Sequence, residues 1–173
     1  EKVALAFEAG AKGSHPVIAI VTGGGLRVQE GVLSLMQMAK TVMASGRLQN
    51  RGLPLLVVLA NPATGQAYSS FANLADVILA EPGSLIGLAP MRTLKEATKK
   101  PIPLDAHTAE AHLNHGLLDG VVDREELREK IITILNVLGP QHSSRDRDTK
   151  VERFKFPQRR NGSMDISEAS ATT

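Results

Sequence analysis

The sequence predicts an α/β fold in which helices cover a parallel β-sheet. Short apolar runs bounded by Gly and Pro alternate along the chain with longer segments in which apolar residues recur at helical spacing. Each connection between successive apolar runs is long enough to hold a helix, which parallel strands require. With 173 residues, of which 42% are hydrophobic, the chain can bury one core.

The expected strands are short and apolar. Residues 16–22 form a continuous apolar run, which is typical of a strand that is buried on both faces. Residues 53–59 and 77–80 follow as two further strands, and residues 117–122 as a short extended piece.

The expected helices lie between these runs. In the last of them, Asp123 and Glu126 have the spacing of a capping box. The helices are predicted at residues 1–9, 28–50, 70–74, 92–100, 108–115 and 123–138.

The longest helix, residues 28–50, carries a wide apolar face and a narrow polar stripe that includes Ser34 and Ser45. This pattern predicts a helix that is largely buried. Its methionines are expected to pack in the core rather than to bind metal. They are Met36, Met38 and Met43.

Three glycines, residues 23–25, join the first strand directly to the longest helix. Glycines let the main chain turn sharply and approach a ligand, and a helix start leaves backbone N–H groups free to hold an anion or an oxyanion. The nucleotide motif G-x-G-x-x-G would need glycine where Val28 stands, and no P-loop sequence follows. A tight turn without any ligand is the alternative interpretation of this segment.

A second glycine-bearing segment, residues 61–72, follows the strand at 53–59 as a small-residue turn and the start of a helix. Ligands in parallel α/β sheets gather beyond the carboxyl ends of the strands. Two such turns on neighbouring strands would therefore place two sets of N–H donors around one pocket, as an oxyanion site requires.

Several segments together resemble the carboxyltransferase β subunit of bacterial and plastid acetyl-CoA carboxylase. Residues 24–41 resemble the hallmark segment of that family, and the resemblance extends in one consistent order over residues 1–138. The other matching segments are residues 61–65 with 69–72, 78–87, 109–110, 115–119 and 124–128.

The resemblance implies a partial crotonase (ClpP/crotonase-like) fold of stacked β-β-α units. Residues 1–139 would be the C-terminal part of the family domain, and the polar, basic residues 140–173 a disordered tail. The implied reaction transfers a carboxyl group from carboxybiotin to acetyl-CoA and forms malonyl-CoA for fatty-acid synthesis. The implied partners are an α subunit in an α2β2 assembly and a separate biotin carboxyl carrier protein, within an ATP-dependent complex of the cytoplasm or plastid stroma.

The resemblance also implies which residues form the site. The oxyanion donors would be the backbone N–H groups of Gly25, Leu26, Gly65 and Gln66, and the substrate-binding residues would be Gly24, Arg27, Thr64 and Arg92.

Three of these positions depart from the family pattern. Leu26 replaces alanine, Gln66 replaces a second glycine, and Pro90-Met91-Arg92 replaces Gly-Pro-Arg. If the backbone at Gln66 needed a positive φ, the side chain would strain it. Two alternatives therefore stay open, namely a catalytically silent assembly subunit and another crotonase-fold acyl-CoA enzyme.

Composition excludes several other classes of function. The absence of cysteine excludes a cysteine-ligated zinc site and disulfides, and no apolar run reaches the roughly twenty residues of a membrane span. With four Phe, one Tyr and no Trp, the chain has few of the aromatic side chains on which single-stranded nucleic-acid binders stack bases, so binding of that kind is not expected. No metal site is predicted, because the closely spaced histidines are expected to be solvated surface residues. These are His107, His112 and His115.

Overall fold

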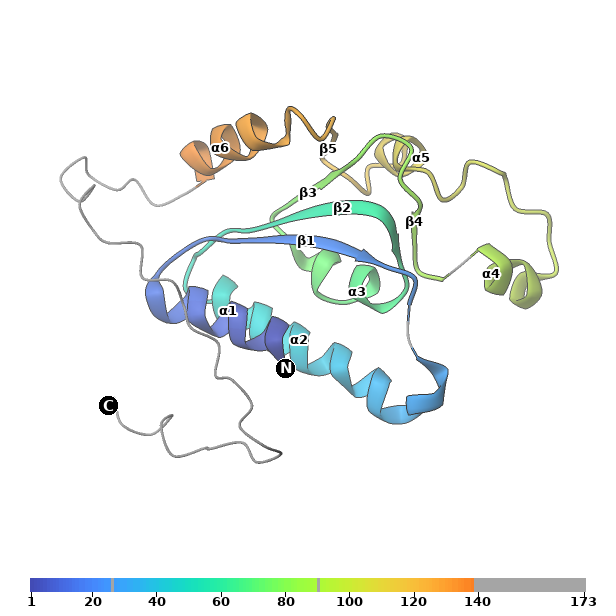
Figure 1. Cartoon of the computed structure of the whole chain (residues 1–173), viewed down its shortest axis with the longest axis horizontal. Helices are drawn as coiled ribbons and strands as arrows, with labels where there is room; N and C mark the ends of the chain where they lie inside the picture. Colours follow the sequence, from blue (N-terminus) through green and yellow to red (C-terminus); the bar gives the residue numbers. More distant parts are fainter. Residues whose placement is uncertain (26, 90, 139–173) are drawn as a thin grey trace. The chain divides into compact units, whose positions relative to one another are not determined.

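The computed structural model describes residues 1–25, 27–89 and 91–138, and it has the predicted alternation of helices and strands (Figure 1). The predicted disordered tail, residues 140–173, lies outside the described residues. In chain order the elements are α1 (Lys2–Gly13), β1 (Val17–Gly23), η1 (Val28–Glu30), α2 (Val32–Gln49), β2 (Leu55–Thr64), α3 (Gln66–Ser69), η2 (Phe71–Leu74), β3 (Val77–Ala80), β4 (Ile86–Gly87), α4 (Met91–Thr98), α5 (Ala109–Asn114), β5 (Gly120–Val121) and α6 (Leu127–Leu138).

The named strands form one parallel sheet in the order β1-β2-β3-β5, with β4 paired to the far end of β2. Strand β2 lies between β1 and β3, and its residues from Leu55 to Leu59 are buried. It continues beyond the predicted end of the strand, because Ala63 and Thr64 pair with β4. The prediction of a turn beginning at Asn61 is therefore wrong, and the chain turns at Gly65.

The main core lies between the sheet and the helices α1 and α2. Phe7 of α1 is fully buried and meets Phe71 edge to face, with ring centroids 5.4 Å apart. Leu48 of α2 and Leu59 of β2 belong to the same cluster. This cluster covers one face of the sheet.

Helix α2 is mostly exposed, so the prediction of a largely buried helix is wrong. Met36 is 60% exposed and Met43 is also exposed, whereas Ser34 and Ser45 are buried. Each of these serines donates a hydrogen bond to a carbonyl of its own chain, from Ser34 to Gly31 and from Ser45 to Val42. Small side chains satisfied in this way can be buried in close packing, and the larger apolar residues of α2 then face outward.

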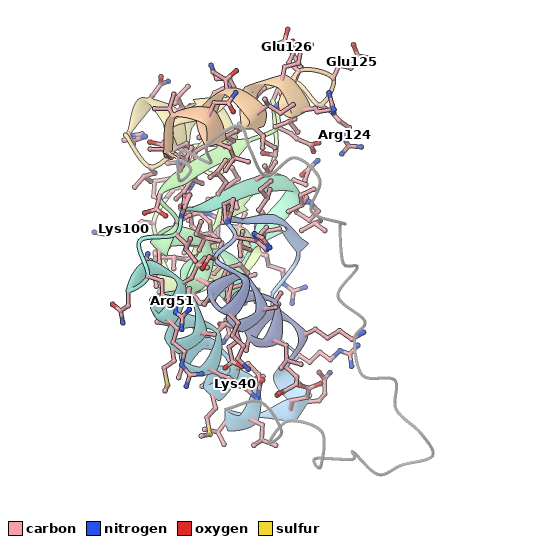
Figure 2. All side chains as sticks on the ribbon, turned by 90° about the vertical axis from the view of Figure 1, so that its left-hand side faces the viewer. Lys40, Arg51, Lys100, Arg124, Glu125 and Glu126 are labelled. Atoms are coloured by element: carbon pink, nitrogen blue, oxygen red, sulfur yellow. The ribbon has the colours of Figure 1, made fainter. Side chains whose placement is uncertain are left out.

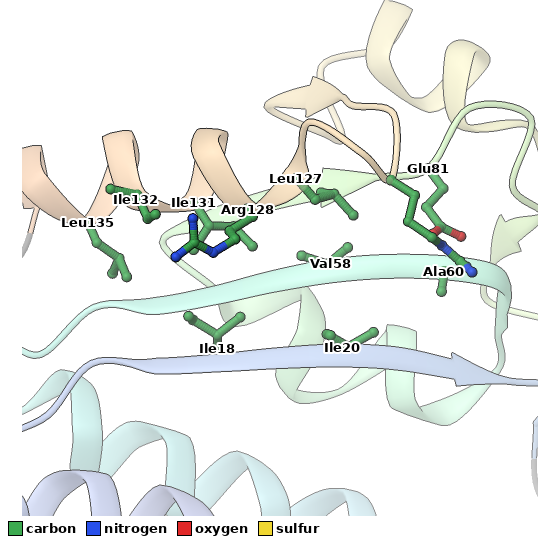
Figure 3. A pocket seen from close by; sticks show the side chains of 11 residues that line it. Ile18, Ile20, Val58, Ala60, Glu81, Leu127, Arg128, Ile131, Ile132 and Leu135 are labelled. Carbon is green, nitrogen blue, oxygen red and sulfur yellow. The ribbon is translucent and has the colours of Figure 1, made fainter. Parts of the chain in front are cut away.

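The outer face of β1 is also less buried than predicted. Ile20 is 72% exposed and lies with Ile18 along an open groove of about 670 Å³ between the sheet and α6 (Figure 3). Helix α6 packs instead over β2 and β3, where Ile131 and Ile134 contact a small cluster around Val58. The prediction that this strand is buried on both faces is therefore wrong.

Helix α6 begins at Leu127, four residues after the predicted start. A turn precedes it, in which Glu126 N–H and Leu127 N–H both donate to the carbonyl of Asp123. Glu125 and Glu126 point outward beside Arg124, which pairs with Glu81 at 2.6 Å (Figure 2). None of the helices in residues 1–25, 27–89 and 91–138 is both long and apolar enough to cross a membrane.

Ser84 offers a test of the packing beside β4. Its Oγ atom is buried and has no hydrogen-bond partner among the described residues. Because an unpaired buried hydroxyl destabilises the folded state, we expect Ser84→Ala to keep or raise the free energy of unfolding, by up to about 2 kcal/mol. Chemical denaturation measures this change.

Thr108→Ala is the matched comparison for that prediction. The Thr108 hydroxyl caps α5 by accepting a hydrogen bond from the Ala111 N–H at 3.2 Å. Its loss is expected to lower the free energy of unfolding by about 1 kcal/mol. A loss from Ser84→Ala as large as that from Thr108→Ala would contradict the assignment of an unpaired hydroxyl.

Candidate active site

The two glycine turns predicted from the sequence meet at the carboxyl ends of β1 and β2. A Cβ atom placed on Gly65 would lie 2.5 Å from the Gly25 Cα atom and 3.3 Å from the Gly25 nitrogen. Both residues have positive φ, +115° at Gly25 and +81° at Gly65. Only glycine permits this backbone and this approach together. We call these two residues the glycine pair.

Hydrogen bonds hold the glycine pair from the sheet side. Gly65 N–H donates to the Gly87 carbonyl of β4 at 2.9 Å, and the Thr64 hydroxyl donates to the Gly23 carbonyl at 3.4 Å. Thr64 therefore ties β2 to β1. The Gly65 N–H is already engaged within the sheet, so it does not serve as the free donor that the sequence suggested.

Free donors remain on both sides of the glycine pair. Among residues 1–25, 27–89 and 91–138, no group accepts a hydrogen bond from Gly25 N–H. Gln66 is the first residue of α3, and the first N–H groups of a helix have no partner within it. Gly65 carries the positive φ and Gln66 does not, so the backbone at Gln66 is not strained by its side chain. Leu26, the remaining predicted donor, lies outside the described residues.

The predicted charged residues form ion pairs on the surface. Arg27 is exposed and pairs with Glu30 at 3.6 Å. Arg92 is exposed on α4 and pairs with Glu96 of the same helix at 3.1 Å. Gly24 is open on its side-chain face, with no atom of the described residues within 4 Å of a Cβ placed there. The described site thus consists of backbone groups, and the two predicted arginines are held in exposed ion pairs.

Two of the three histidines are buried, which corrects the prediction that they lie on the surface. His107 is 8% exposed and His112 is 7% exposed, whereas His115 is exposed. The His112 ring bonds through Nδ1 to the Thr108 carbonyl and meets Tyr68 edge to face. The sequence carries only a weak sign that these histidines are buried. Thr108, which caps α5 directly after His107, was the one residue that marked this loop as ordered.

Burial of His107 predicts a dependence of stability on pH. Burial lowers the pKa of this imidazole below its ordinary value of 6.5, and the charge of the nearby His112 lowers it further. The unfolded chain therefore binds this proton more readily than the folded protein. The stabilisation is complete above about pH 6.5 and is lost as the pH falls from there through the folded pKa.

Urea denaturation at about pH 8 and about pH 5.5 measures this effect. We expect the free energy of unfolding to fall on acidification, and to fall less in His107→Phe, which keeps a flat ring but cannot be protonated. His115→Ala is the control, because His115 is exposed. An equal fall in His107→Phe and in the unsubstituted protein would contradict the assignment to His107.

Comparisons with known sequences agree with the resemblance described above. Residues 1–170 match the family described as Carboxyl transferase domain. The acetyl-coenzyme A carboxylase carboxyl transferase subunit β of Opitutus terrae is 49% identical over 138 residues, which are 80% of this chain and 47% of that subunit. The corresponding subunit of Thermus thermophilus is 44% identical over 140 residues, with 81% and 49% covered. The chain spans about half the length of these relatives.

Solved structures confirm the predicted crotonase-like α/β fold. A Pseudomonas malonate decarboxylase heterodimer has a chain that aligns with a TM-score of 0.70 and 23% identity, covering 81% of this chain and 64% of that one. The 12S component of transcarboxylase aligns with a TM-score of 0.69 and 28% identity, covering 81% and 27%. From its sequence match and its fold, the chain belongs to the carboxyl transferase domain family.

Proposed function

We propose that this chain provides the crotonase-like core of an acetyl-CoA carboxylase carboxyltransferase β subunit. It transfers a carboxyl group from carboxybiotin to acetyl-CoA and forms malonyl-CoA for fatty-acid synthesis. The names of relatives that are 44% to 49% identical support this assignment. The chain spans about half the length of each of these relatives.

The contact within the glycine pair is the observation that carries the proposal. It brings the Gly25 N–H and the start of α3 at Gln66 to one end of the sheet. Backbone donors held in this way stabilise negative charge on a thioester oxygen or on the biotin ureido oxygen. Removal of one such donor typically lowers kcat by about 10²–10³-fold. Gly65 acts as a positioning residue, because its own N–H bonds to Gly87.

The transfer balances without an acidic or basic side chain. The N–CO₂ bond of carboxybiotin breaks, and the ureido nitrogen that is released takes a proton from the methyl group of acetyl-CoA. The resulting enolate carbon then bonds to the carbon dioxide held beside it. The chain supplies the hydrogen-bond donors that favour the enolate oxygen, and both biotin, on its carrier protein, and acetyl-CoA enter as substrates.

The predicted substrate-binding residues have different parts in this proposal. Gly24 leaves open space for the substrate, and Thr64 holds β1 against β2. Arg27 and Arg92 are exposed guanidinium groups that could exchange their surface carboxylates for the phosphates of CoA.

Arg92→Ala tests the phosphate contact. An exposed ion pair contributes up to about 1 kcal/mol, so we expect the KM for malonyl-CoA to rise about 3- to 5-fold while kcat stays unchanged. Arg47→Ala is the matched control, because Arg47 is likewise exposed and pairs with Glu8 at 2.6 Å. Steady-state kinetics over a range of ionic strengths measures both. An unchanged KM in Arg92→Ala would remove this residue from the proposed site.

The proposed partners are a carboxyltransferase α subunit, in an α2β2 assembly, and a biotin carboxyl carrier protein, in the cytoplasm or the plastid stroma. A relative from Natranaerobius thermophilus that is 46% identical over 145 residues is named as subunits beta/alpha together. That name supports an assembly in which both subunits act side by side.

Biocytin-dependent decarboxylation of malonyl-CoA tests the proposed function. The protein is co-expressed with a carboxyltransferase α subunit, and thioester loss is followed with and without biocytin. We expect decarboxylation only when biocytin is present. Hydration of an enoyl-CoA without biocytin would instead indicate another crotonase-fold acyl-CoA enzyme, and a stable complex without turnover would indicate a silent assembly subunit.

A further inference from the structure

The glycine pair depends on the short strand β4. Strand β4 has two residues and lies beside the end of β2, where Thr64 pairs with Gly87 (Figure 1). The Gly87 carbonyl accepts the Gly65 N–H at 2.9 Å. A displacement of Gly87 therefore moves Gly65 and changes the distance from Gly65 to Gly25.

The outer side of β4 is held by the loop that precedes α5. Ile86 N–H donates to the His107 carbonyl at 2.7 Å, and Leu85 forms an antiparallel bridge with Thr108. Both contacts hold the backbone before Gly87. At Gly87 itself the neighbour is the His107 side chain.

The His107 ring lies where a side chain of Gly87 would stand. A Cβ atom placed on Gly87 would be 2.9 Å from Cε1, 3.0 Å from Nε2 and 3.1 Å from Nδ1 of His107. Three nearly equal distances mean that the ring presents its face, since an edge-on ring would bring Cε1 clearly closer than the two nitrogens. Because the side chain of a strand residue points out of the sheet, the flat ring limits movement of Gly87 out of the sheet on that face.

We propose that His107 is a positioning residue for the carboxyl transfer, which supports Gly87 and thereby sets the spacing of the glycine pair. The effect of His107 on catalysis rests on the proposed function. Its support of Gly87 rests on the packing alone. The His107 ring contacts Gly87 of β4, and β4 pairs with the end of β2, which carries the glycine pair. His107 therefore acts on the proposed substrate site through β4 and does not touch it. Its removal should therefore change kcat and leave the KM for malonyl-CoA nearly unchanged.

A double-mutant cycle on Gly87 and His107 tests the contact directly. His107→Ala removes the ring, and Gly87→Ala adds a methyl group that the ring obstructs. We expect each single substitution to lower kcat about 10- to 100-fold, because a displacement near 1 Å at a catalytic site has effects of that size. In the double variant the methyl group enters the vacated space, and the loss should be smaller than the product of the two single losses by about 3- to 100-fold.

The cycle is measured on the protein in complex with its α subunit, with His115→Ala as the control. His115 is exposed at the end of α5, so its removal should leave kcat unchanged. Single losses that multiply in the double variant would overturn the inference. If His107→Ala fails to fold, His107→Phe and His107→Leu replace it. Phe, which keeps a flat face, should retain kcat, and equal losses in both would overturn the inference.

Hydrogen exchange separates this inference from the proposed function. The Gly65 N–H is protected by its bond to the Gly87 carbonyl, so its exchange should become faster in His107→Ala and not in His115→Ala. Faster exchange in a protein without transferase activity would support the positioning role and contradict the proposed function. Unchanged exchange and unchanged kcat in an active enzyme would overturn the positioning role alone.

Discussion

Gly65→Ala is expected to lower the rate of carboxyl transfer at least about 100-fold. The added Cβ atom would lie 2.5 Å from the Gly25 Cα atom, and backbone atoms cannot move aside as a flexible side chain does. The two strand ends must separate, so the donors at Gly25 and Gln66 no longer share one site. The measurement is kcat for biocytin-dependent decarboxylation of malonyl-CoA, with the folded fraction checked by circular dichroism.

Gly52→Ala is the matched control for that substitution. Gly52 also has positive φ, +67°, but within the part of the chain that the structure describes no atom lies within 4 Å of a Cβ placed there. Both substitutions thus place alanine at a positive φ, at a cost of about 1 kcal/mol or more, and only Gly65→Ala also creates a backbone collision. Equal kcat values for the two variants would show that the close approach of the glycine pair is irrelevant to catalysis.

Phe7→Ala is expected to lower the free energy of unfolding by about 3–5 kcal/mol, the largest stability effect that we predict for one side chain. Phe7 is fully buried, belongs to the main core and packs against the ring of Phe71. A loss of this size is a large part of the total stability of a typical domain. Urea denaturation followed by circular dichroism measures it.

Val3→Ala on the same helix is the control for Phe7→Ala. Val3 is exposed, and its truncation should change the free energy of unfolding by less than about 0.5 kcal/mol. If Phe7→Ala lost no more stability than Val3→Ala, the core described here between α1 and the sheet would be incorrect.

The sequence was sufficient for the elements that depend on local patterns. The strands at β1, β2 and β3 follow apolar runs bounded by Gly and Pro, and all pair in parallel as the long connections required. The meeting of Gly25 and Gly65 also follows from local signals. Both glycines come directly after neighbouring parallel strands, and parallel strands end at the same edge of a sheet.

The errors concern features that depend on tertiary contacts. The buried face of α2 was predicted wrongly. The apolar stripe around Met36 predicts burial of that face, but the opposite face with Ser34 is buried, and the Ser34 hydroxyl donates a hydrogen bond to the Gly31 carbonyl. The engagement of Gly65 N–H depends on β4, a two-residue strand that follows β2 by more than twenty positions. The burial of His107 depends on the same strand. No local periodicity carries such information.

The most direct test of the account follows the carboxyl group itself. Malonyl-CoA with a radiolabelled carboxyl group is incubated with biocytin, the α subunit and this protein, and labelled carboxybiocytin is collected. We predict label on biocytin in the complete mixture, with little when either subunit is omitted or when Gly65→Ala is used. Equal transfer with the unsubstituted protein and with Gly65→Ala would contradict the claim that the glycine pair forms the transfer site.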